Sequence, residues 1–174
     1  MCQARGVARS SIYEAAGGMP AFLRLAAAHH RRCLDDPILN HPFSHPGHRD
    51  HVARLALYWA EVLGGPAEFT RCCGDHAAVL HLHAHTDAEL DMGRRFVACF
   101  GDALDDAELP EDSELRDELG AYMQWAVADV MSFAPKDSVV PDTRAVPRWT
   151  WGGVVSRTAR ESPVDLSVRR AGTR

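Results

Sequence analysis

The sequence predicts an all-α protein. Apolar residues recur at three- and four-residue steps up to about Phe133, and glycine and proline separate the runs. No window alternates convincingly between apolar and polar residues, as a strand would. The chain has 174 residues, of which 46% are hydrophobic and 25% charged, and this suits one globular domain with a tail. We therefore expect a compact set of five or six helices with short connections.

The first two long helices are predicted on either side of a proline-rich elbow. The first covers 19–36 and stops at Pro37, because proline cannot continue a helix. The elbow covers 40–47, and the second helix covers 48–63, ended by the Gly-Gly-Pro sequence at 64–66. The apolar stripes of these two helices are Phe22, Leu25, Ala26, His29 and Cys33, and Val52, Leu55, Tyr58, Trp59 and Val62.

Three further helices are expected in the second half of the chain. A short one covers 76–83, with Asp75 as its N-cap candidate, and longer ones cover 87–106 and 112–133. The stripes of the two long helices are Leu90, Phe96, Val97, Phe100 and Leu104, and Leu115, Leu119, Tyr122, Met123, Val127, Val130 and Met131.

The two ends of the chain differ from the helical part. Residues 1–10 form an N-terminal extension, and we predict an irregular or disordered tail over 135–174, where prolines recur and periodicity fades. Trp149 and Trp151 are an exception within this tail, because indole side chains rarely lie free in solvent. The sequence leaves open whether they dock on the helical body or on a partner.

Charge and cysteine content narrow the range of functions. The net charge is −5. Residues 1–134 contain eleven basic and twenty acidic residues, whereas residues 135–174 contain eight basic and four acidic ones. An acidic body gives no reason to expect nucleic acid as a partner. No apolar run is long enough for a membrane span, and no apolar segment follows the first arginines as a secretory signal requires. Five cysteines without a C-x-x-C pair indicate reduced thiols and a cytoplasmic protein.

The ten histidines are the unusual feature of the composition. A structural role is the ordinary explanation for each one. His81 and His85 have a spacing that can hold a metal ion, but no glutamate lies between them and no E-x-x-H repeat is present. Val79, Leu80 and Leu82 are expected to make the buried side of the short helix apolar, and a histidine that projects from such a helix, as His83 does, suits an axial haem ligand. A buried core histidine explains His83 equally well.

Four stretches of the sequence, in order, resemble the truncated haemoglobins, and the group II branch most. They are Ser11–Gly18, Asp36–Phe43, Arg54–Pro66 and Val79–Ala84, with Gly93–Phe100 behind them resembling the G helix. The resemblance covers about residues 11–134. It implies a truncated globin domain, a two-over-two helical sandwich around haem b.

The resemblance implies roles for seven residues. His83 falls on the iron ligand, Phe43 on the aromatic residue that wedges the haem, and Arg54 on a residue that pairs with a propionate. Leu55 and Phe96 would keep the pocket dry. Two departures are visible here: Phe96 stands where the group II proteins typically have tryptophan, and the distal positions are both histidine.

The distal residues implied by the resemblance are His30 and His51. The family often has tyrosine at the first position and a small residue at the second. An imidazole N–H from either histidine could donate a hydrogen bond to the partial negative charge of bound dioxygen, and one of the two could instead bind the iron directly when no gas is present.

The sequence therefore predicts a haem globin that binds dioxygen or a related diatomic ligand. The sequence leaves three points open: whether the protein detoxifies nitric oxide or peroxide, which reductase reduces its iron, and whether it forms a homodimer. Two alternatives also remain: a cofactor-free helical interaction module that uses Trp149 and Trp151, and a non-haem metalloprotein that uses the histidines of 76–85. The tail after Pro135 is expected to be dispensable for haem binding.

Overall fold

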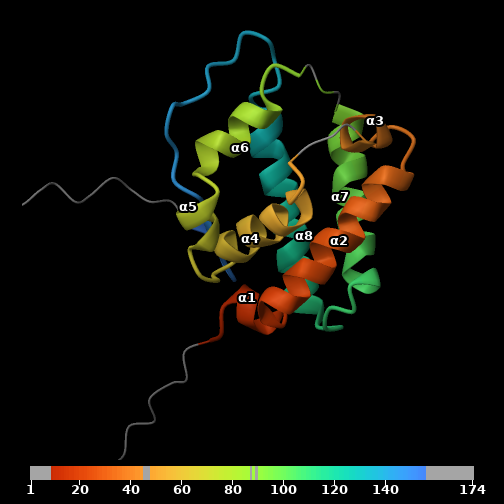
Figure 1. Ribbon diagram of the computed structural model, residues 1–174. Coiled ribbons are helices and arrows are strands. Elements are labelled where there is room, and N and C mark those ends of the chain that lie inside the picture. Colours follow the sequence, from red (N-terminus) through yellow and green to blue (C-terminus); the bar gives the residue numbers. More distant parts are fainter. Residues whose placement is uncertain (1–8, 45–47, 87, 89, 156–174) are drawn as a thin grey trace, which may run out of the picture.

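The computed structural model describes residues 9–44, 48–86, 88 and 90–155 (Figure 1). These residues form eight helices and one two-stranded sheet. No helix among them is both long and apolar enough to cross a membrane. The helices are α1 (Ile12–Ala15), α2 (Gly18–Asp35), α3 (Asn40–Ser44), α4 (His51–Val62), α5 (Glu68–Cys72), α6 (His76–His83), α7 (Leu90–Asp106) and α8 (Ser113–Met131).

The five predicted helices are confirmed as α2, α4, α6, α7 and α8. The short α6 has the predicted bounds, and the Asp75 carboxylate accepts a hydrogen bond from the Ala78 N–H at 3.1 Å, as an N-cap does. The three helices of four or five residues were not predicted as helices, because one turn is too short to show a 3.6-residue period. One of them, α3, lies within the predicted elbow.

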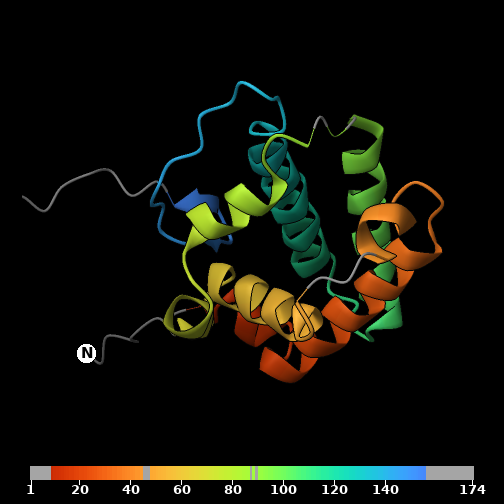
Figure 2. The same ribbon diagram turned by 45° about the horizontal axis from the view of Figure 1, so that its top comes forward.

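The long helices pack in two pairs, α2 with α4 and α7 with α8, and α2 also lies along α7. The predicted stripe of α2 is fully buried between them, from Phe22 to Cys33. In contrast, α6 lies across the molecule from α2 and α7 (Figure 2) and has only three buried residues. Among the described elements, α6 packs mainly against α8, so His83 lies on a helix with few helix neighbours.

The segment after Pro135 differs from the prediction of an irregular tail. Residues 136–147 form no helix or strand, but β1 (Arg148–Thr150) and β2 (Gly153–Val155) pair as an antiparallel hairpin. Trp149 is 7% exposed, its ring lies 5.7 Å from that of Trp125, and its indole N–H donates to Glu118 Oε2 at 2.9 Å. Burial of this large ring explains the order of the segment. Residues 156–174 lie outside the described residues.

The last two residues of the N-terminal extension, Arg9 and Ser10, contact the same hairpin. The indole N–H of Trp151 donates to the carbonyl of Ser10 at 2.7 Å, and the Arg9 guanidinium lies 3.5 Å from the centre of the Trp151 ring. Arg9 also pairs with Glu114 at 2.7 Å. Both tryptophans thus dock on this chain, and Trp149 is not available as the contact surface that an interaction module would need.

Trp149→Ala should lower the free energy of unfolding by about 3–5 kcal/mol, because it removes a buried ring and leaves Glu118 without its partner. Urea unfolding followed by circular dichroism measures this. Val155→Ala in the same hairpin is the matched control, since Val155 is 46% exposed. Equal losses in the two variants would show that Trp149 is not part of the core.

Candidate functional site

A cavity of about 1460 Å³ lies among α2, α4, α6, α7 and α8. This is larger than the range of about 300–1,000 Å³ that is usual for small-molecule sites. All seven residues that the sequence singled out line it. They are His30, Phe43, His51, Arg54, Leu55, His83 and Phe96.

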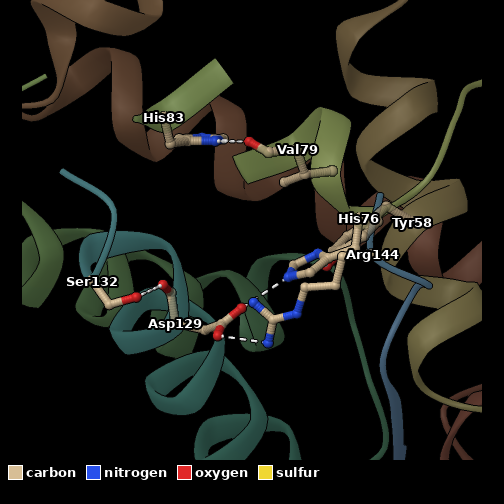
Figure 3. A network of polar contacts seen from close by, with 7 residues as sticks. All are labelled: Tyr58, His76, Val79, His83, Asp129, Ser132 and Arg144. Carbon is tan, nitrogen blue, oxygen red and sulfur yellow. Dashed lines mark hydrogen bonds and ion pairs between the residues drawn. The ribbon is translucent and has the colours of Figure 1, made fainter. Parts of the chain in front are cut away.

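His83 faces the cavity from the last turn of α6. Its Nδ1 lies 2.8 Å from the carbonyl oxygen of Val79, one turn earlier (Figure 3). A carbonyl can only accept, so Nδ1 carries the proton and Nε2 keeps a lone pair. This is the arrangement in which an imidazole is held by one nitrogen and coordinates a metal through the other. Leu82 was expected on the buried side of α6 but is 77% exposed, and it also lines the cavity.

The other histidines of 76–85 do not converge with His83. His81 is exposed and is not among the cavity-lining residues. The His85 ring faces the Lys136 carbonyl, with its Nδ1 3.1 Å from that oxygen, and the His76 ring is held between Tyr58 and Asp129. Among the described residues, no group of three histidine, cysteine, aspartate or glutamate side chains could hold a metal ion. The non-haem metal site therefore has no support in the described part of the chain.

His30 on α2 and His51 on α4 face each other in the cavity wall. Their ring centres are 5.3 Å apart, and Phe43 lies 5.7 Å from the first and 6.2 Å from the second. Burial lowers the pKa of both imidazoles, so each is neutral at physiological pH. Nδ1 of His30 is buried and has no hydrogen-bond partner within the described residues. An unpaired buried nitrogen costs free energy until a polar partner reaches it.

Arg54 lies on the same helix as His51 and borders the cavity. Its guanidinium donates to the carbonyl of Cys73 at 3.2 Å, and it has no carboxylate partner among the described residues. Arg54 thus offers unpaired positive charge next to the cavity. Leu55, the next residue, supplies a half-buried apolar surface.

His29 was expected only as part of a buried stripe, but it supports the site directly. The ring is fully buried, lies 4.3 Å from that of Phe96 and 5.4 Å from that of Trp59, and its Nε2 donates to the Phe96 carbonyl at 3.3 Å. Burial lowers its pKa to about 4. His29 therefore fixes Phe96, which lines the cavity, from behind.

These features define a globin of the truncated type, and the comparisons with known proteins agree. Residues 11–133 match the family of bacterial-like globins. The chain belongs to this family, which implies haem-based binding of gases. No curated protein matches it.

Solved structures show the same fold. The haemoglobin of Thermobifida fusca is 25% identical, with a TM-score of 0.59 over 70% of this chain and 96% of that one. The haemoglobin of Chloroflexus aurantiacus is 24% identical, with a TM-score of 0.60 over 70% and 98%. The group II truncated haemoglobin of Bacillus anthracis is 17% identical, with a TM-score of 0.63 over 71% and 92%. The predicted resemblance and the two-over-two sandwich are confirmed.

The buried His29 makes stability depend on pH. Its pKa of about 4 in the folded protein lies below the ordinary 6.5, so between these values the unfolded chain takes up a proton that the folded chain excludes. The stabilising effect is complete above pH 6.5 and is lost as the pH falls to about 4, to an extent of up to about 3 kcal/mol. His29→Gln should show a shallower fall of the unfolding free energy over this range in urea titrations.

His81→Gln is the matched control for this measurement, because His81 is exposed on the surface of α6. Its pH profile should follow that of the unaltered protein. A profile of His29→Gln that is as steep as the control would show that His29 does not carry the effect.

Proposed function

We propose that the chain binds haem b in the cavity and holds its iron through Nε2 of His83. The observation that carries this proposal is the contact of His83 Nδ1 with the Val79 carbonyl, which leaves Nε2 as a lone-pair donor in the cavity wall. The expected roles of the other residues follow from their places in the same wall. Phe43, Leu55 and Phe96 supply apolar contacts to the porphyrin, and Arg54 supplies the cation for a propionate.

Bound haem would supply the iron that takes up dioxygen or a related diatomic gas. The residues of this chain that would contact the gas are His30 and His51, which offer neutral N–H donors in a part of the cavity wall that also contains Phe43. We favour His30 as the residue that donates to the gas. Its unpaired buried Nδ1 means that a polar ligand would satisfy a group that otherwise costs free energy.

The same pair supports a second candidate activity, the detoxification of peroxide or nitric oxide. Neutral imidazoles with ring centres 5.3 Å apart can accept and return protons, which heterolysis of a peroxide requires. The proposal includes an unidentified reductase that would reduce the iron. It also includes a cytoplasmic location, because free thiols are typical of that compartment and Cys33, Cys72, Cys73 and Cys99 are free.

His83→Ala should lose haem or hold it loosely, because His76, the other imidazole of α6 that lines the cavity, is engaged at both ring nitrogens by Tyr58 and Asp129. The protein is purified with haem and passed over a desalting column, and the Soret absorbance per protein is then measured. His81→Ala is the control on the same helix and should retain haem as the unaltered protein does. Equal retention in both variants would overturn the assignment of the iron ligand.

His30→Phe should speed the release of dioxygen about two- to tenfold, the effect of one lost hydrogen bond, while His51→Leu has a smaller effect. Stopped-flow release of dioxygen from the ferrous protein measures both rates. A larger acceleration in His51→Leu would reverse this ranking. Unchanged rates in both variants would mean that neither histidine contacts the gas.

A further inference from the structure

Four buried or half-buried polar residues form a continuous chain beside the cavity (Figure 3). The Tyr58 hydroxyl lies 2.7 Å from Nδ1 of His76, and Nε2 of His76 lies 2.8 Å from Oδ2 of Asp129. Oδ1 of Asp129 accepts from the Arg144 guanidinium at 2.9 Å. The four residues come from α4, α6, α8 and the segment before β1, and Tyr58 and His76 also line the cavity.

The direction of each hydrogen bond follows from its neighbours. A carboxylate paired with a guanidinium accepts only, so His76 donates through Nε2–H. Nδ1 of the neutral ring must then accept, and the Tyr58 hydroxyl donates to it. The buried polar atoms of His76 are all paired, in one orientation of the ring. A network satisfied in this way fixes the position of its members.

This chain of contacts holds the start of α6. His76 is the first residue of that helix and lies seven residues before His83, its last residue. Seven residues make two turns with a drift of only about 20°, so both side chains lie on nearly the same side of the helix. A shift or rotation at His76 is therefore passed to His83 by the rigid helix between them.

Few other contacts could fix α6. Its buried residues are His76, Ala77 and Leu80. Arg144 adds two backbone contacts at the start of the helix: its carbonyl accepts from the His76 N–H at 2.8 Å, and its N–H donates to Asp75 Oδ2 at 3.1 Å. At the other end, the His85 N–H donates to the Phe133 carbonyl at 3.1 Å. Polar contacts to α8 and to the segment after it thus hold both ends of α6.

We infer that Tyr58, His76, Asp129 and Arg144 are positioning residues that set the place of the His83 imidazole at the haem. The inference rests on the proposed role of His83 as the iron ligand. It gives a function to Arg144, which lies beyond the region that matches the globin family. If the network only added stability to the fold, breaking the network would leave the iron–histidine bond unchanged.

The decisive variant is Asp129→Asn, which keeps the shape of the side chain but removes the charge that pairs with Arg144 and orients His76. The matched control is Asp106→Asn, which breaks the contact of Asp106 with Arg32 between α2 and α7. Both variants are studied as full-length protein loaded with haem. The first readout is the iron–histidine stretching band of the ferrous, gas-free protein by resonance Raman spectroscopy.

We expect the band to shift or broaden in Asp129→Asn and to keep its place in Asp106→Asn. The second readout is amide hydrogen exchange, which should become about tenfold faster in 76–84 of Asp129→Asn and stay unchanged in the same segment of the control. Tyr58→Phe removes only the last hydrogen bond of the network, so its iron–histidine band should move less than that of Asp129→Asn. Arg144→Lys keeps the positive charge, so its iron–histidine band should lie closer to that of the unaltered protein than the band of Arg144→Gln.

An unmoved band in Asp129→Asn, with haem bound, would overturn the positioning role and leave His83 as the ligand. The same conclusion follows if exchange quickens equally in all helices, because the network would then contribute only to overall stability. Failure of the unaltered protein to bind haem would overturn the proposed function, and the inference with it.

Discussion

The site depends on how α6 is fixed. A helix that borders a large cavity cannot be embedded on all sides, and only Ala77 and Leu80 among its apolar residues are buried. The apolar contacts that position α2 and α4 are thus scarce here. Directional contacts take their place, and hydrogen bonds specify position more sharply than apolar packing because they are lost within a few tenths of an ångström. The candidate iron ligand is placed by hydrogen bonds at the two ends of its helix.

The opposite wall follows a different physical rule. There, α2 lies between α4 and α7, and aromatic rings fix one another around the fully buried His29. The rings of Phe96 and Trp59 pack edge-on against the imidazole ring, with ring centres 4.3 and 5.4 Å away. His30, the next residue, points into the cavity instead. One helical step thus separates a histidine that supports the wall from one that can meet a ligand, because consecutive side chains of a helix point about 100° apart.

The sequence could predict the parts of the molecule that repeat with a period. The five longer helices, the buried stripe of α2 and the bounds of α6 all depend on local spacing and end signals. The resemblance implied seven of the residues that line the cavity, and of these His83 was also indicated by its apolar surroundings. The contacts of His76 could not be predicted, because Asp129 lies 53 residues away and no local pattern connects them. The sequence likewise indicated that Trp149 needs a contact but could not predict which one, since nothing near it in sequence points to Glu118.

The border of the family match is therefore not the border of the structural unit. Residues 11–133 carry the globin helices, yet the start of α6 is bound to Arg144, and Trp149 is buried against α8. Docking of the hairpin already closes the loop between α8 and β1, so the contacts of Arg144 within that loop cost less further entropy. A segment without helical periodicity can thus take part in the site, because what it contributes is a few directional contacts and one buried ring rather than a repeating apolar face.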